Sequence, residues 1–108
     1  MDRTAELGLS EAHFNLGNRY MNGKISDGKG VTHHIAKGVR NWGMAAMKGN
    51  VEARCNLGYL ELSNGNHERA IKHLLIAAKM GDKVALDYVK KMFGGGLATK
   101  EQYAEALK

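Results

Sequence analysis

Asn15-Leu16-Gly17 recurs as Asn56-Leu57-Gly58, 41 residues further along the chain. The same offset relates one pair of glycines and one pair of alanines, Gly8 with Gly49 and Ala12 with Ala53. Four matches in a single register are typical of a structural repeat. The chain of 108 residues therefore contains at least two copies of one unit.

A second offset, of 32 residues, relates later parts of the chain. It connects two alanine pairs, two glycines and two further alanines, namely Ala45-Ala46 with Ala77-Ala78, Gly49 with Gly81, and Ala53 with Ala85. The offsets differ by nine residues, so the first copy is longer, and the extra residues lie between Tyr20 and Ile35. Residues 21–30 are rich in glycine and polar residues, which predicts a loop there.

Outside this loop the apolar residues have helical spacing. Ala53, Leu57 and Leu60 fall at i, i+4 and i+7, and no segment alternates with the period of a strand. We expect helices at residues 10–22, 34–48, 51–63, 66–80 and 83–93. Thr99 and Gln102 form a capping box that predicts a last helix through Leu107. The 14 glycines and the absence of proline favour helices that end in glycine caps.

Composition limits the function classes. The single cysteine excludes an internal disulfide, and no apolar run approaches the length of a membrane helix, so we expect a cytoplasmic protein with no membrane partner. The net charge is +5, but the lysines and arginines are scattered among acidic residues. Because phosphate binding needs clustered cations, no nucleic-acid partner is expected.

Large and small residues alternate between the expected helices. Trp42 and Leu74 occupy the same place in the two copies, where a large side chain should fill the space between helices. Small residues permit the helix backbones to approach closely, at Gly17, Gly58, Ala46 and Ala78. The sequence therefore predicts an all-α fold of packed antiparallel helix pairs.

The repeated positions also form a longer motif. The first copy supplies Ala12, Leu16-Gly17, Tyr20, Gly30-Val31, Lys37, Trp42, Ala45-Ala46 and Gly49. The second copy supplies Ala53, Leu57-Gly58, Ala70, Ala77-Ala78 and Gly81. Together these residues resemble the Sel1-like repeats, which are relatives of the tetratricopeptide repeats. Two departures are Gly38, where that family usually has alanine, and the long loop before Gly30.

The resemblance implies a right-handed α-solenoid of about two and a half units with a C-terminal capping helix. Residues 1–8 align with the end of a unit's second helix, so further repeats could precede Met1. Residues 9–49 then form the first repeat, 50–81 the second, and 82–108 a partial repeat with the cap.

Two groups of residues match known ligand-binding motifs only in part. Gly23 to Gly30 nearly matches a phosphate-binding loop, but Gly30 stands where Ser or Thr is needed, and a helix precedes it where that motif requires a strand. His33 and His34 lack further ligands at zinc spacing. We therefore expect no enzyme, no catalytic residue, no metal and no cofactor.

The remaining candidate is a surface. In relatives of this type the first helix of each unit lines a concave groove, and the resemblance places a set of polar, aromatic and aliphatic residues there. These partner-binding candidates are Glu11, Phe14, Asn18, Met21, Glu52, Cys55, Tyr59, Leu62, Val84, Asp87 and Lys91. Aromatic residues are common anchors of protein interfaces.

We accordingly expect a scaffold or adaptor that binds a protein or peptide in this groove. Two alternatives stay open at this point: a structural spacer within a longer repeat array, with no ligand of its own, and a nucleotide-binding protein that uses the loop from Gly23 to Gly30. The sequence names neither the partner nor the oligomeric state.

Overall fold

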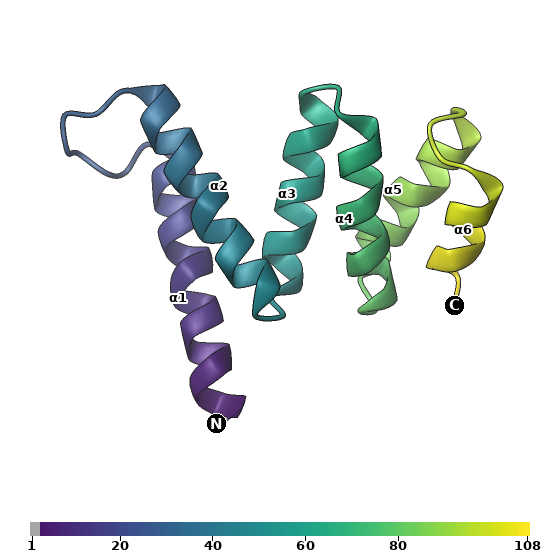
Figure 1. Ribbon diagram of the computed structural model, residues 1–108, viewed down its shortest axis with the longest axis horizontal. Coiled ribbons are helices and arrows are strands. Elements are labelled where there is room, and N and C mark those ends of the chain that lie inside the picture. The colour runs from purple at the N-terminus through teal and green to yellow at the C-terminus, as the bar shows by residue number, and fades with distance from the viewer. Residues whose placement is uncertain (1–2) are drawn as a thin grey trace. The chain divides into compact units, whose positions relative to one another are not determined.

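The computed structural model describes residues 3–108, and within this range the chain forms six helices in sequential antiparallel pairs, with no strand (Figure 1). The helices are α1 (Arg3–Met21), α2 (Val31–Met47), α3 (Val51–Ser63), α4 (His67–Lys79), α5 (Lys83–Gly94) and α6 (Lys100–Ala106). The predicted all-α class is confirmed. None of the described helices is both long and apolar enough to cross a membrane.

The chain divides into two compact units after Ala53. The first contains α1, α2 and the beginning of α3, and the second contains the rest of α3 with α4, α5 and α6. A long loop connects α1 and α2 and is visible beside these helices in Figure 1. It contains the nine extra residues that the two sequence offsets predict.

Glycine caps end the helices as predicted. The residues with positive φ that follow α1 to α5 are Gly23, Gly49, Gly65, Gly81 and Gly96. After α2, the Gly49 N–H donates to the Ala46 carbonyl and the Asn50 N–H to the Ala45 carbonyl, each at 3.0 Å. This pair of bonds, the Schellman motif, satisfies carbonyls that the last helical turn would otherwise leave without partners.

The same turn also starts the next helix. The Asn50 side chain accepts a hydrogen bond from the Ala53 N–H at 2.8 Å, which caps α3. In the second unit, Asp82 follows Gly81 and accepts from the Ala85 N–H at 2.8 Å. Residues related by the 32-residue offset therefore form the same local structure twice.

Trp42 fills the space between α1 and α2, as its position predicts. Only 8% of the side chain is exposed, and a Cβ atom built on Gly17 would lie 2.5 Å from the Trp42 Cδ1 atom. The indole N–H donates to the Asn18 side-chain oxygen at 2.9 Å. Gly38 of α2 also permits a close contact between the two helices, because a Cβ there would lie 2.5 Å from the sulfur of Met21. An alanine at Gly38 would require the Met21 side chain to move.

Leu74 has the matching role in the second unit. It is fully buried, and a Cβ built on Gly58 of α3 would lie 3.0 Å from its Cγ and Cδ2 atoms. Ile71 and Val89 are also buried in this core, and α6 packs against both α4 and α5.

The start of α1 differs most from the prediction, and α2 also begins three residues earlier than predicted, at Val31. α1 runs unbroken from Arg3 to Met21, whereas the alignment places the end of a separate helix near Gly8. That turn is wrong, because Gly8 does not have the positive φ of a capping glycine. Its neighbours Ala5, Glu6, Leu7 and Leu9 favour helix, and one glycine inside a helix costs only about 1 kcal/mol.

The capping box of α6 supplies a stability prediction. The Thr99 hydroxyl accepts from the Gln102 N–H at 3.0 Å, and the Gln102 side chain accepts from the Thr99 N–H at 2.8 Å. Thr99→Ala removes the first bond and is expected to lower the free energy of unfolding by about 1 kcal/mol in urea titrations. Thr99→Ser keeps the hydroxyl and should match the parent. Equal losses in both variants would contradict a capping role.

Candidate functional site

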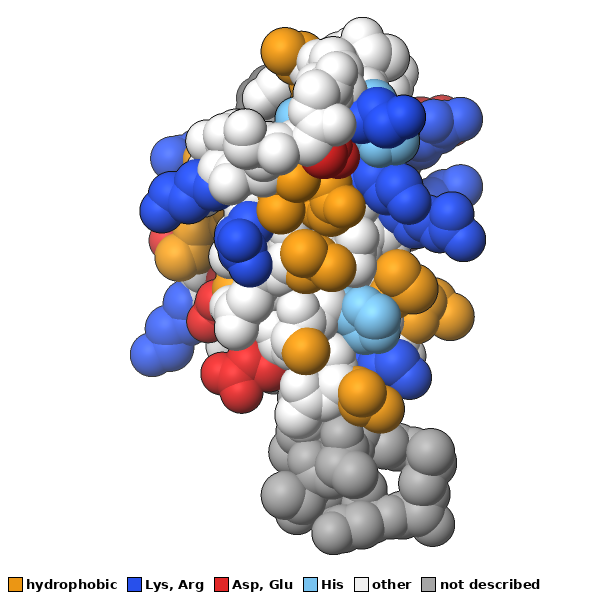
Figure 2. All heavy atoms as spheres, turned by 90° about the vertical axis from the view of Figure 1, so that its left-hand side faces the viewer, with side chains coloured by type: hydrophobic (Ala, Val, Ile, Leu, Met, Phe, Trp, Pro, Cys, Tyr) orange, Lys and Arg blue, Asp and Glu red, His pale blue; other side chains and the backbone are white. Residues whose placement is uncertain are grey.

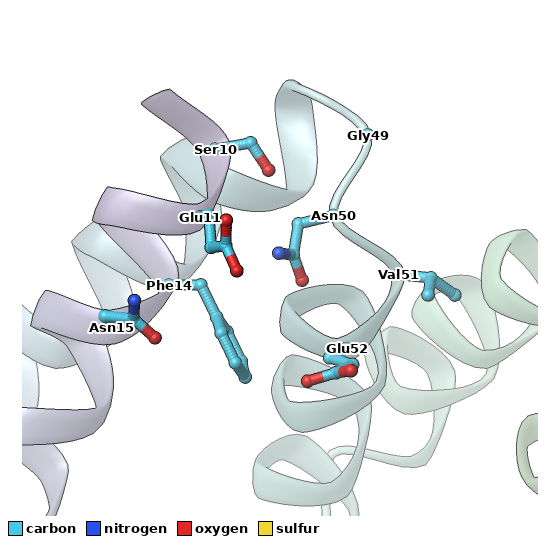
Figure 3. Close-up of a pocket in the computed structure, with 8 residues that line it drawn as sticks. All are labelled: Ser10, Glu11, Phe14, Asn15, Gly49, Asn50, Val51 and Glu52. Carbon is cyan, nitrogen blue, oxygen red and sulfur yellow. The ribbon is translucent and has the colours of Figure 1, made fainter. Parts of the chain in front are cut away.

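A cavity of about 540 Å³ lies in the first unit, between α1 and the turn that leads into α3 (Figure 3). Three of the predicted partner-binding residues line it, namely Glu11, Phe14 and Glu52. The other lining residues are Ser10, Asn15, Gly49, Asn50 and Val51. Three of the five candidates in this unit therefore line the cavity, and Asn18 and Met21 do not.

Local structure explains how these side chains converge. Glu11 and Phe14 are three residues apart on α1, so they project from neighbouring turns of one helix face. The capped turn at Gly49 and Asn50 places Glu52 across from them. Figure 3 shows the side chains of Glu11, Phe14, Asn50 and Glu52 directed into the space, while Val51 points away.

The cavity combines an aromatic wall with acidic groups. Phe14 is half-buried, and both Glu11 and Glu52 are exposed to solvent. Glu52 lies in the first turn of α3, where the helix dipole offsets part of its negative charge. Glu11 has no such compensation from its position in mid-helix. Carboxylates beside an aromatic ring suit a cation on an aliphatic stem.

The second unit holds a separate cluster, which we call the tyrosine patch: Cys55, Tyr59, Tyr88 and Lys91. The rings of Tyr59 and Tyr88 lie 4.9 Å apart between centroids, and the Lys91 ammonium lies 5.6 Å from the centre of the Tyr88 ring. Cys55 is only 4% exposed. Burial, and then the neighbouring Cys55, raise the pKa of the Tyr59 hydroxyl above its ordinary value.

Tyr88 was not among the predicted residues. The offsets place it at the position of Asn15 and Asn56, which are polar, so the repeat gave no reason to select it. Its position next to Asp87, on the same short helix as Lys91, could have indicated that Tyr88 lies near the predicted partner-binding residues.

Two predicted residues take part in packing between α1 and α2. The Asn18 side chain holds the Trp42 indole, and the Met21 side chain fills the space that Gly38 leaves. On the helices of the tyrosine patch, Leu62 is half-buried, whereas Val84 and Asp87 are exposed. The cavity and the tyrosine patch therefore contain six of the eleven candidates.

The loop from Gly23 to Gly30 is organised around Asp27. Its carboxylate lies 2.7 Å from His34 Nε2 and accepts from the Lys29 N–H at 3.0 Å. The contact with His34, and then the bond from Lys29, lower the pKa of Asp27. The loop follows helix α1, so the strand that a phosphate-binding loop requires before it is replaced by a helix.

The histidines make contacts of different kinds. His73 Nδ1 is 3.4 Å from the Arg54 guanidinium, and burial followed by this positive neighbour lowers the pKa of His73. His13 Nδ1 lies 3.4 Å from the Asn41 side-chain oxygen. Among the residues that the structure describes, no three His, Cys, Asp or Glu side chains are placed to hold a metal ion.

Comparison with family models, with curated proteins and with solved structures finds no match. The resemblance to Sel1-like repeats therefore stays a prediction from sequence motifs.

Proposed function

We propose that this chain is an adaptor module, an α-solenoid of Sel1-like helix pairs, that binds a peptide or protein partner. The observation that carries the proposal is the cavity beside α1. Glu11, Phe14 and Glu52 are partner-binding candidates through the resemblance to Sel1-like repeats, and they line one cavity with room for a side chain. Its volume falls within the usual range of binding pockets.

The groups around the cavity favour a basic side chain. The methylene stem of a lysine or arginine would lie against the Phe14 ring, and its charged end would reach the carboxylates of Glu11 and Glu52. Charge-assisted hydrogen bonds to carboxylates are about twice as strong as neutral ones, and a cation on an aromatic face adds roughly 0.5 to 2 kcal/mol. The preferred ligand is thus a peptide segment with an accessible Lys or Arg.

The tyrosine patch is a second contact in its own unit. Tyr59 and Tyr88 present rigid rings of the kind that anchor partners, while the Lys91 charge beside Tyr88 suits an acidic or carbonyl group. Its preference is therefore different from that of the acidic cavity.

A random peptide library selected on the protein tests this assignment. We expect selected peptides to share a Lys or Arg, and Glu11→Gln and Phe14→Ala each to weaken their binding by about tenfold in fluorescence anisotropy, which corresponds to the loss of one good contact. Glu101→Gln, which removes an exposed carboxylate from α6, is the matched control and should bind as the parent does.

The cavity is not the site if selected peptides bind the Glu11→Gln and Phe14→Ala variants as tightly as they bind the parent. If Phe14→Ala unfolds the protein, the ring is needed for packing. In that case Glu11→Gln, on an exposed side chain, decides whether the cavity binds the peptides.

A further inference from the structure

α1 carries a second surface, on the side away from the cavity. Leu9, Ala12 and Leu16 follow i, i+3, i+7 spacing and form an apolar stripe, with the half-buried Tyr20 continuing it by one turn. Leu9 is 47% exposed and Leu16 is 37% exposed. Gly17 and Met21, which contact α2, lie on a different face of the helix. The helix therefore has one covered apolar face and one open one.

In the other copies of the repeat, the residues equivalent to Ala12 and Leu16 are buried. The sequence offsets place Ala53 and Ala85 at the position of Ala12, and both are fully buried. They place Leu57 and Val89 at the position of Leu16, with exposures of 7% and 0%. In the second unit, both α4 and α6 pack against α5. The equivalent residues of α5, Ala85 and Val89, are therefore buried within a set of packed helices.

The shape of the stripe fits a helix as well. Ala12 is a small residue between two leucines, so the surface has a hollow with a ridge on either side. Helices associate by placing side chains of one into hollows of the other. An incoming helix with a large residue opposite Ala12 would bury both leucines.

Basic residues flank the stripe. Arg19 is exposed on one side of it. On the other side, His13 meets Asn41 of α2, and Lys37 and Lys48 lie four residues before and seven after Asn41, on that same side of α2. Figure 2 shows apolar side chains running down this face, with lysine and arginine on both flanks and acidic side chains lower on one of them. Asp27, an acidic residue of the neighbouring loop, is already paired with His34.

These charges decide between possible occupants. A second copy bound through the same face would place Arg19, Lys37 and Lys48 of each chain near their counterparts, because an isologous interface brings the same patches together. Like charges at an interface cost affinity. A helix with acidic flanks would instead gain affinity from Arg19, Lys37 and Lys48.

We infer that the stripe of Leu9, Ala12 and Leu16 is a docking surface for an amphipathic α-helix of another protein, with leucine-type residues on its apolar face and Glu or Asp along its edges. This site is distinct from the cavity, which prefers basic groups and lies on another face of α1. The module can thus hold two partners of opposite charge.

A designed peptide pair tests the inference with the full chain. The first peptide is a helix of about 20 residues with a leucine seam and glutamate flanks, and the second has lysine in place of each glutamate. We expect the glutamate peptide to bind in fluorescence anisotropy and to weaken at high ionic strength, and the lysine peptide to bind at least about tenfold less tightly.

Variants then locate the site. Leu16→Glu should weaken the glutamate peptide by about tenfold or more, since it places a like charge on the seam, and Arg19→Glu should weaken it by several-fold. Leu97→Glu, at an exposed leucine of the second unit, should change nothing. Phe14→Ala should also leave this binding unchanged, which separates this site from the cavity.

Three results would overturn the inference. The two peptides could bind equally, or the glutamate peptide could bind the Leu16→Glu and Arg19→Glu variants as tightly as the parent. The third is a dimer in light scattering that Leu16→Glu converts to monomer, which would assign the stripe to a second copy. If Leu16→Glu fails to fold, Arg19→Glu still decides the question, because its side chain is exposed.

Discussion

Trp42→Ala is expected to lower the free energy of unfolding by about 3 to 5 kcal/mol, the usual cost of removing a buried tryptophan. The side chain is 8% exposed and fills the space that Gly17 opens between α1 and α2. Its removal leaves a cavity beside the Gly17 backbone. It also leaves the Asn18 oxygen without the indole donor. Urea unfolding followed by far-ultraviolet circular dichroism measures the loss without relying on tryptophan fluorescence.

Two further variants separate the contributions. Trp42→Phe keeps a ring but loses the N–H, so its stability should lie between those of the parent and Trp42→Ala. Met47→Ala removes a side chain that is 82% exposed on the same helix, and should change stability by less than about 0.5 kcal/mol. If Trp42→Ala and Met47→Ala unfold at the same urea concentration, Trp42 does not hold the first helix pair together.

The helices and their ends could be predicted because their signals are local. A glycine directly after an apolar helical run, as at Gly49 and Gly81, needs only its own φ and two backbone bonds to end a helix. Gly8 shows the limit of this rule. It matches Gly49 in the alignment, yet its backbone stays helical because the residues on both sides support the helix. The alignment matches the identities of the two residues and does not report their backbone conformations.

The candidate site was predictable only in part, for a tertiary reason. Glu11, Phe14, Asn18 and Met21 share one helical period, so the sequence treats them alike. The structure distinguishes them by what stands opposite: the Trp42 indole meets Asn18, and the empty space at Gly38 admits Met21. Such pairings between helices cannot be obtained from one helix alone.

The two surfaces of α1 favour partners of opposite charge. The cavity places carboxylates beside Phe14, whereas Arg19 and Lys37 flank the apolar stripe. A partner with a basic segment and a partner with an acidic helix would therefore be steered to different faces of one helix. This separation favours the adaptor role over a spacer with no ligand, since a spacer has no need of two faces with opposite preferences.

Gly58→Leu is expected to destabilise the second unit by about 1 to 3 kcal/mol through overpacking. A Cβ at this position already lies 3.0 Å from two atoms of Leu74, and Leu74 is fully buried and cannot move aside without disturbing the core. The matched control is Gly43→Leu, also in mid-helix, where a Cβ has nothing within 4 Å. There the better helix propensity of leucine should raise stability by up to about 1 kcal/mol. The two substitutions are chemically identical, so urea midpoints that move in opposite directions isolate the close approach of α3 and α4. Midpoints that move together would show that helix propensity, and not contact with Leu74, sets the effect at Gly58.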